Sequence, residues 1–176
     1  MFLNKIKIFL LINIFLILFS LIHNFANSEE KESIFGIAKV IDGDTIKIND
    51  KKIRLFGIDA PEIKQFCKKP YLSISFLSFQ KKYSCGIKST NNLKRMIKNN
   101  NIDCKIKGID RYRRIIGECY KNKTNINSWM VRNGYAVAYT KYSKKFVAQQ
   151  NLAKKEKLGI WVGSFEMPWD WRKKYK

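Results

Sequence analysis

Four carboxylates in the first half of the chain stand where strands are expected to end. Asp42 and Asp44 flank a glycine in a turn sequence, and Asp59 and Glu62 follow the segment that carries Arg54. Loop carboxylates that converge in space supply the hard oxygen ligands that calcium requires. A lone Asp-Gly-Asp turn is common for structural reasons, because Asp and Gly are ordinary turn residues. The nearby arginine favours a functional interpretation, since a cation so close to an acidic site would face an anionic substrate.

Short β-strands must bring these residues together. β-branched residues and turn signals predict strands at 34–41, 45–48, 53–58, 102–109, 114–120 and 135–139. Apolar spacing predicts helices at 89–99, 125–134 and 144–158. Five main strands with about three α-helices indicate an α+β fold, namely a Greek-key β-barrel like the OB-fold. The segment 63–85 reads as a long loop held by cysteines at both ends, although its apolar patch could form an additional strand.

The formal charge of +21 is the strongest compositional signal. An excess of Lys and Arg attracts polyanions, so nucleic acid or an anionic membrane surface is the expected partner. A composition biased towards Lys, Ile and Asn is the alternative explanation, in which part of the charge is a solvated coat.

Residues 1–28 have the layout of a secretory signal peptide. Lys5 and Lys7 precede an apolar run from residue 8 to residue 22, and small residues follow before Glu29. The run is short for a bilayer span, but an uncleaved membrane anchor remains the alternative. Both interpretations place residues 29–176 outside the cytosol, as a periplasmic, secreted or membrane-anchored domain.

The four cysteines agree with export, because an even number fits an oxidising compartment. A zinc site is the competing interpretation. It is disfavoured because no cysteine pair has the short spacing of a zinc motif and the single histidine, His23, lies in the N-terminal segment.

The cysteine spacing predicts the pairing. A hairpin that turns between residues 111 and 112 places Cys104 directly opposite Cys119, at a separation that suits a disulfide. Cys67 is then left to pair with Cys85.

Five motifs in order resemble the thermonuclease, or staphylococcal-nuclease-like, family. They lie at 40–45, 54–62, 110–114, 130–136 and 159–161. The resemblance covers nearly all of the chain after the N-terminal segment. It implies a hydrolase, a calcium-dependent endonuclease that cleaves phosphodiester bonds of DNA and RNA with little base specificity and leaves a 3′-phosphate.

The resemblance also implies a set of calcium ligands. Asp44 and Asp59 match the ligating carboxylates, and the main-chain carbonyl of Thr45 matches a third ligand. Asp42 is expected near the metal, through water.

The remaining roles follow from the same motifs. Arg54 and Arg114 match the arginines that bind the scissile phosphate, and Glu62 matches the carboxylate that activates or orients the attacking water. Guanidinium groups suit the charge that develops on the phosphate in the transition state. The residues expected to line the nucleotide groove are Arg111, Tyr112, Tyr139 and Tyr142.

Two positions depart from the common pattern of the family. Ala60 stands where the type member has threonine, and alanine is also used there. Arg113 replaces the usual glycine before Arg114, at a turn position where other residues are strained. Arg114 would then be displaced, or Arg113 would take its role.

Two other functions compete with the enzyme. The first is a non-catalytic nucleic-acid-binding barrel, which the retained acids and Arg54 disfavour. The second is a basic protein attached to an anionic membrane through residues 1–28 and the tail 169–176.

Overall fold

The computed structural model describes residues 7, 10–16, 19, 32–74 and 77–175. The chain divides into two compact units, Met1–Lys31 and Glu32–Lys176. Residues 10–16 of the first unit are helical. The expected leader at 1–28 lies largely outside the described residues, so its boundary stays a prediction. No helix in the described parts of the chain is long and apolar enough to cross a membrane.

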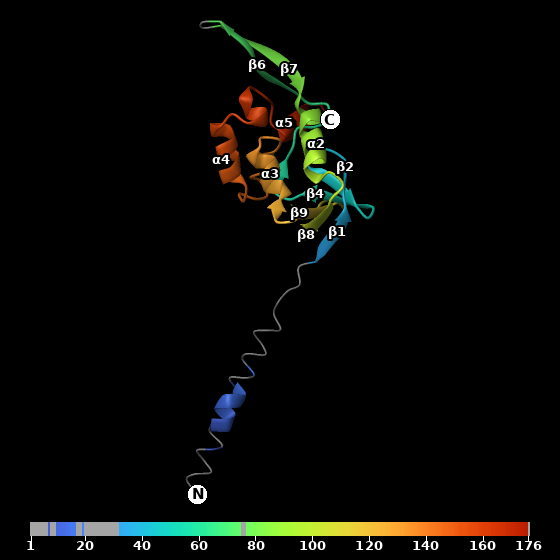
Figure 1. Ribbon diagram of the computed structural model, residues 1–176, viewed down its shortest axis with the longest axis vertical. Helices are drawn as coiled ribbons and strands as arrows, with labels where there is room; N and C mark the ends of the chain where they lie inside the picture. Colours follow the sequence, from blue (N-terminus) through green and yellow to red (C-terminus); the bar gives the residue numbers. More distant parts are fainter. Residues whose placement is uncertain (1–6, 8–9, 17–18, 20–31, 75–76, 176) are drawn as a thin grey trace. The chain divides into compact units, whose positions relative to one another are not determined.

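A curled sheet forms the centre of the second unit (Figure 1). Its main strands are β1 (Ser33–Ile37), β2 (Lys39–Val40), β3 (Thr45–Ile48), β4 (Lys51–Leu55), β8 (Asn101–Ile109) and β9 (Ile115–Lys121). They are ordered β1-β8-β9-β4-β3-β2. Because β1 and β2 are consecutive along the chain and stand at opposite ends of this order, the sheet curls back on itself. Counting β1 and β2 as one bent strand, the predicted five-stranded α+β barrel is confirmed.

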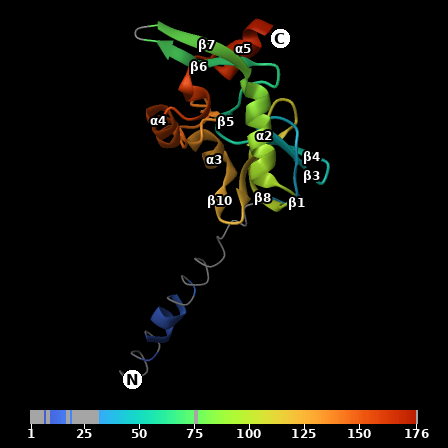
Figure 2. The same cartoon turned by 45° about the horizontal axis from the view of Figure 1, so that its top comes forward.

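Short strands and helices surround the sheet (Figure 2). The strands are β5 (Ile58–Asp59), β10 (Thr124–Asn125) and β11 (Val137–Ala138), and the helices are α2 (Cys85–Ile97), α3 (Ile126–Arg132), α4 (Val147–Lys155), the 3-10 helix η1 (Gly159–Val162) and α5 (Pro168–Tyr175). The expected strand at 53–58 is broken, because Gly57 adopts a φ of 70° in a turn between β4 and β5. The expected helix at 89–99 begins earlier, at Cys85, and α5 was not predicted.

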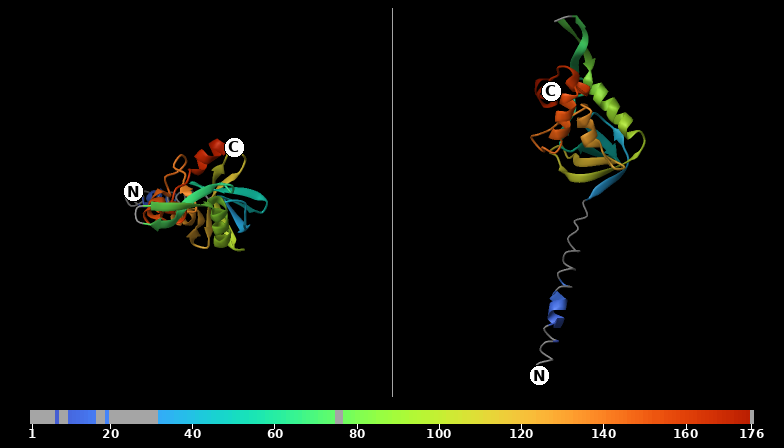
Figure 3. Two further views of the ribbon diagram at one scale, coloured as in Figure 1. Left: turned by 90° about the horizontal axis from the view of Figure 1, so that it is seen from above. Right: turned by 60° about the vertical axis from the view of Figure 1, so that its left-hand side comes forward.

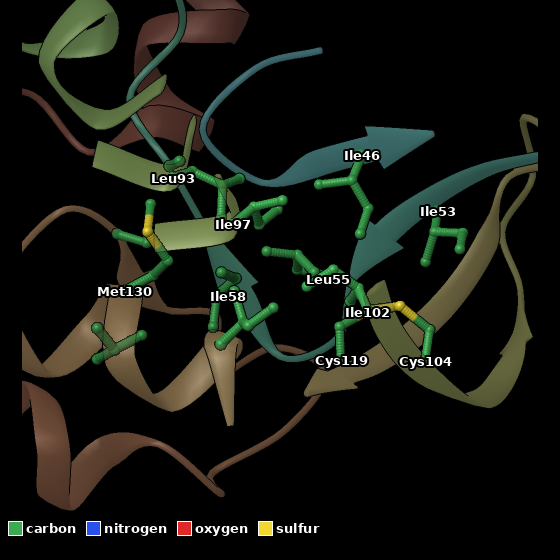
Figure 4. Close-up of a cluster of buried hydrophobic side chains, with 14 of the residues drawn as sticks. Ile46, Ile53, Leu55, Ile58, Leu93, Ile97, Ile102, Cys104, Cys119 and Met130 are labelled. Carbon is green, nitrogen blue, oxygen red and sulfur yellow. A yellow bond between two sulfur atoms is a disulfide. The ribbon is translucent and has the colours of Figure 1, made fainter. Parts of the chain in front are cut away.

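The core lies between the sheet and α2 and α3 (Figure 4). Alternate residues of the strands, such as Ile46 and Ile48 of β3, point inward and are fully buried. They meet Leu93 and Ile97 of α2 and Met130 of α3. Burial of one such side chain contributes about 1.5–3 kcal/mol, so this contact anchors the helices on the barrel.

The β8–β9 hairpin carries the first disulfide, between the fully buried Cys104 and Cys119. The two cysteines are paired across the strands, as their spacing predicted. The register shifts by one residue between Ile106 and Gly108, so the hairpin is centred on Tyr112 and not between residues 111 and 112. The extra residue of this bulge lies beside the turn that holds Arg114.

The segment 63–85 corrects the prediction of a long loop. It forms an antiparallel hairpin of β6 (Phe66–Ile74) and β7 (Leu77–Ser84), which extends away from the barrel beyond the end of α2 (Figures 1 and 3). The second disulfide, Cys67–Cys85, closes the base of this hairpin. Side chains are exposed on both faces, so the strands lack the alternation that marks a half-buried strand.

A buried amide ties the sheet to the turn that precedes the acids. The fully buried Asn127 donates to the carbonyl oxygens of Phe56 (2.9 Å) and Gly117 (3.2 Å) and accepts from the N–H of Cys119 (3.0 Å). Its side chain therefore fixes the path of the chain between β4 and β5.

We expect Asn127→Ala to lower the free energy of unfolding by about 3 kcal/mol, because it leaves buried backbone groups without partners. Urea denaturation followed by circular dichroism measures the loss. The matched control is Asn151→Ala on the exposed surface of α4, which should change stability by less than about 0.5 kcal/mol. Equal stability of both variants would contradict the role given to Asn127.

Candidate active site

The β3–β4 pair places the first acid beside the first arginine. Asp44 directly precedes β3, and Thr45 at the start of β3 is paired with Arg54 on β4. The carbonyl oxygen of Asp44 accepts a hydrogen bond from the N–H of Leu55 at 2.8 Å. Ile53 and Leu55 point into the core, so Arg54 between them points to the opposite face of the strand.

Arg54 joins two buried carboxylates. Its Nη1 lies 2.8 Å from Oδ1 of Asp44, and its Nη2 lies 2.7 Å from Oδ1 of Asp59. Asp44 also accepts from the hydroxyl of Thr45 (3.1 Å) and from the N–H of Ala60 (2.9 Å). The predicted site residues of β3, β4 and β5 therefore converge, although they come from three strands.

A second arginine, from the C-terminal helix, lies on the same acids. Arg172 of α5 donates to both oxygens of Asp59, with Nη1–Oδ1 at 3.0 Å and Nη2–Oδ2 at 2.7 Å. Its Nη1 also lies 2.9 Å from Oε1 of Glu62. Asp59 is fully buried and Glu62 is partly exposed, so Glu62 stands at the outer edge of this group of charges.

The main chain of Glu62 is fixed by two neighbours. The fully buried Gln65 accepts from the N–H of Glu62 (3.2 Å) through its side chain and donates its own N–H to the carbonyl of Glu62 (2.7 Å). Gly86, at the start of α2, packs so closely that a Cβ there would collide with the Glu62 carbonyl. The position of Glu62 is therefore set before any ligand binds.

The local charge balance suits a divalent cation. The carboxylates of Asp42, Asp44, Asp59 and Glu62 exceed the guanidinium groups of Arg54 and Arg172 by two charges, and hard oxygen donors are those that calcium prefers. Within the residues that the structure describes, no group of three acidic, histidine or cysteine side chains is already arranged as a metal cluster.

Thr45 is the least available of the expected ligands. Its carbonyl oxygen accepts from the N–H groups of Ile41 (2.9 Å) and Asp42 (3.3 Å), which close the turn before β3. A carbonyl oxygen has two lone pairs, so both are used in this conformation. Binding of a cation by the Thr45 carbonyl would therefore require this turn to rearrange.

Burial perturbs two of the acids. Burial and the neighbouring Asp44 carboxylate raise the pKa of Asp42 to about 6. Burial also raises the pKa of Asp59 to about 6, although hydrogen bonds from Arg172 oppose the shift. Both groups are ionised at neutral pH and take up protons as the pH falls through 6.

We expect calcium affinity to fall by at least about tenfold between pH 7 and pH 5, because protonation of Asp42 and Asp59 removes the charge that attracts the cation. Isothermal titration calorimetry at the two pH values measures the change. The folding stability of the calcium-free protein should change in the opposite direction. The pKa values of Asp42 and Asp59 are raised above those of the unfolded chain, so the uptake of protons as the pH falls stabilises the folded state. An affinity that does not vary with pH would exclude both acids from the cation site.

Arg114 lies in the turn between β8 and β9, where Asp110 holds it. Its Nε and Nη2 lie 2.8 and 2.7 Å from Oδ2 of Asp110. Despite partial burial, hydrogen bonds from Arg114 and from the N–H of Tyr112 lower the pKa of Asp110. The adjacent strand β9 pairs with β4 in parallel, with Arg54 opposite Ile116. Arg114 directly precedes β9, the strand beside β4, and the contacts seen for its guanidinium are those with Asp110 and Tyr112.

The turn also shows how Arg113 is accommodated. Arg113 has a φ of 60°, the left-handed conformation that favours glycine, and its side chain is exposed. Arg111 and Arg114 both lie against the ring of Tyr112, at 4.8 and 5.5 Å from its centroid. Arg111 and Tyr112 thus form an exposed basic and aromatic surface at this turn.

Of the other two predicted groove residues, Tyr139 lies close to Asp59 and Tyr142 lies beside Tyr139. The N–H of Tyr139 donates to Gly57 (2.9 Å), and burial together with the Asp59 carboxylate raises the pKa of the Tyr139 hydroxyl. Tyr142 contacts Tyr139 edge to face and is exposed. The ring of Tyr139 also stacks on that of Trp169 of α5, with ring centroids 5.4 Å apart.

Sequence reasoning missed two residues of this site. Gln65 lay in a segment taken for a loop, and Arg172 lay in a tail considered only as a membrane contact. Gln65 also donates to the carbonyl of Glu166 (2.6 Å), so it links the Glu62 segment to the start of α5. The local signals for a helix at the C-terminus are Pro168, since proline is favoured in a first helical turn, and the acid Asp170 in the first turn ahead of basic residues in the last.

Comparisons of the sequence with a family profile and with individual known proteins agree with each other. The profile of a family described as Staphylococcal nuclease homologue matches residues 52–163. An uncharacterized endonuclease of Escherichia coli is 33% identical over 144 residues, which cover 77% of this chain and 82% of that protein. The micrococcal nuclease of Shigella flexneri is 29% identical over 159 residues, 80% of each chain. A succinoglycan biosynthesis protein, ExoI of Rhizobium meliloti, is 34% identical, and the match covers 74% of this chain but only 65% of that relative. The chain belongs to the staphylococcal nuclease homologue family.

Proposed function

We propose that this protein is an exported, calcium-dependent endonuclease that hydrolyses phosphodiester bonds of DNA and RNA with little base specificity. Membership of the family supports a hydrolytic nuclease. The observation that supports the proposal best is the convergence of Asp44, Asp59 and Arg54, which places anionic cation ligands and a cation for phosphate within hydrogen-bond distance of one another.

Each residue has a role that follows from its chemistry. Asp44 and Asp59 would hold calcium, with Thr45 and Asp42 contributing after rearrangement of their turn, and the ion would supply charge that neutralises phosphate oxygens. Glu62 accepts a proton from the water that attacks phosphorus, while the bond to the 5′-oxygen breaks and that oxygen takes up a proton from solvent to give a 5′-hydroxyl. Arg54 and Arg114 donate to the non-bridging oxygens, whose negative charge increases in the transition state.

The basic and aromatic surfaces would bind the polynucleotide on either side of this group. Arg111 and Tyr112 present a cation and a ring at the β8–β9 turn. Tyr139 presents a ring near Asp59, and Tyr142 lies beside Tyr139. Stacking on aromatic side chains is tolerant of base identity, because every base has a π face. These contacts are consistent with a nuclease of low base specificity.

The two disulfides favour an oxidising location, such as the periplasm or the medium. Membrane attachment through residues 1–28 stays a prediction, and residues 29–176 are the proposed nuclease domain.

A digestion assay tests the proposed activity. Purified residues 29–176 should degrade duplex DNA and RNA in the presence of calcium and should be inactive with a chelator. Binding of DNA that depends on salt but proceeds without cleavage would replace the nuclease by a non-catalytic binding protein.

A further inference from the structure

The C-terminal helix lies on the site that calcium and substrate are proposed to use. We infer that α5 is a built-in ligand of the active site: Arg172 holds the cation position, Trp169 holds a base-stacking position, and both must leave when calcium and polynucleotide bind. This inference rests on the proposed function, because it names what competes with calcium and substrate.

The first argument for this inference is that Arg172 already occupies the carboxylate of Asp59. Arg172 binds both oxygens of Asp59, and Arg54 binds Oδ1 as well. The carboxylate is fully buried, and both of its oxygens are bound by guanidinium groups while Arg172 is in place. Arg172 also engages Glu62, the group proposed to activate water. A guanidinium thus neutralises the same charges that calcium would neutralise.

The stacking of Tyr139 carries the second step. Trp169 lies on its ring with an angle of 8° between the planes and a centroid separation of 5.4 Å. A nucleobase that stacked on this face of Tyr139 would occupy the same space. Trp169 and Arg172 lie three residues apart, so one face of α5 presents an aromatic ring and a cation together.

The segment before α5 has contacts of its own besides these two. Glu166 is bound by the buried Gln65, and the main chain of Ser164 pairs with that of Lys68 in both directions (2.8 and 3.2 Å). Beyond it, Lys173 and Tyr175 are exposed. The geometry therefore allows α5 to leave the acids by a rotation near Met167 while the chain before it stays in place.

Calcium affinities of four full-length proteins test the inference: the wild type, Arg172→Gln, Trp169→Ala and Lys173→Gln. Arg172→Gln should bind calcium at least about fivefold more tightly than the wild type. This factor is at the lower end of the range by which one bound group usually changes the affinity of a protein for another. Trp169→Ala should also bind more tightly. It changes no charge, so its effect reports undocking of α5 and not the loss of a nearby cation. Lys173→Gln, which removes an exposed charge from the same helix, is the control and should match the wild type.

Amide hydrogen exchange supplies a readout besides affinity and activity. Calcium should raise the exchange of residues 168–175 in the wild type towards the level that Arg172→Gln shows without calcium. Equal calcium affinity of all four proteins, or wild-type affinity in Trp169→Ala, would overturn the inference. Absence of calcium binding by every variant would overturn it too. If calcium binds as expected but DNA is not cut, the proposed function fails while the inference stands.

A different observation supports a second surface. The sequence from Ile63 to Ile102 contains nine Lys and Arg residues and no acid. In the β6–β7 hairpin, Lys68 lies opposite Lys82 and Lys69 opposite Lys81, and all four are exposed. Like charges directly opposite on neighbouring strands are destabilising, so a bound polyanion would relieve a repulsion that the free hairpin carries.

The same hairpin carries exposed aromatic side chains. Tyr71 and Phe79 are 71% and 50% exposed, an unusual exposure for aromatic residues, and Lys81 lies 5.9 Å from the ring centroid of Tyr71. Cys67–Cys85 fixes the base of the hairpin, which begins four residues after Glu62. We propose that the hairpin binds the backbone of the polynucleotide outside the active site, with the lysines on phosphates and the rings on bases or sugars.

Binding to fluorescent duplex DNA, followed by anisotropy in EDTA, tests this second surface without cleavage. Replacing Lys68, Lys69, Lys81 and Lys82 by glutamine should weaken the Kd for a 30-base-pair duplex by about tenfold or more and lower the slope of log Kd against log salt by about 0.9 for each lost phosphate contact.

A control variant with the same net charge separates a local from a general effect. It carries glutamine at four exposed positions elsewhere, Lys39, Lys105, Lys123 and Lys155. Equal losses in both variants, or wild-type binding by the hairpin variant, would overturn the proposal. The proposal would also be overturned if the hairpin variant lost binding to vesicles of anionic lipid but kept its affinity for DNA. The hairpin would then be a membrane contact.

Discussion

Glu62→Gln is expected to lower kcat by at least about 100-fold while DNA binding stays within a few-fold of the wild type. The amide keeps the size of the side chain but cannot accept the proton of the attacking water. The main chain at this position is held by Gln65, so the substitution should leave the geometry of the segment intact. Steady-state cleavage of a fluorogenic oligonucleotide and a separate binding measurement distinguish the two quantities.

The matched control is Glu156→Gln. Glu156 also forms an ion pair with an arginine, Arg132, but this pair is on the surface beside α4. Its loss should leave kcat unchanged, because exposed pairs contribute little and the pair is not part of the site. Wild-type turnover by Glu62→Gln would remove Glu62 from the mechanism.

The second large effect concerns Arg113 and Arg114 of the β8–β9 turn. Arg114→Ala is expected to lower kcat/KM by about 100-fold or more, on the order of 3 kcal/mol, because a positioned charge donor to the phosphate is lost. Arg113→Ala should cost far less. Arg113→Gly should retain or exceed wild-type activity, since Arg113 has a φ of 60° and glycine adopts that conformation without strain.

The three variants decide between two assignments. If Arg113 supplies the phosphate contact, Arg113→Gly becomes the damaging change and Arg114→Ala the mild one. Arg95→Ala, on the exposed face of α2, controls for the general loss of one positive charge. Wild-type kinetics in all of these variants would exclude both turn arginines from catalysis.

The barrel could be predicted because its strands have a local signature. Ile46, Ile48, Ile53 and Leu55 are buried on alternate positions, and turn residues separate the strands. The pairing of Cys104 with Cys119 followed from the same simple geometry. Only the centre of the turn differs from the prediction. The bulge near Lys107 adds one residue, which changes the register of the hairpin but not which strands pair.

The hairpin and the C-terminal helix could not be predicted by these rules. β6 and β7 are solvated on both faces, so their sequence shows no alternation. α5 packs through Trp169 and Arg172, and the partner of Arg172 at Asp59 is 113 residues away in the sequence. A contact of this kind leaves no periodic pattern near the residue that makes it. Asp42, Asp44 and Asp59 could be selected as candidate site residues from the sequence, because turn position and residue type are both local properties.

The two disulfides make the fold depend on where the chain is. Cys67–Cys85 and Cys104–Cys119 close loops with separations of 18 and 15 residues, each of which adds about 3 kcal/mol of stability in the loop-entropy description. In a reducing cytosol the cysteines remain thiols, so the domain lacks a large part of the stability that small proteins possess. The domain therefore reaches its full stability only in a compartment where both cysteine pairs are oxidised.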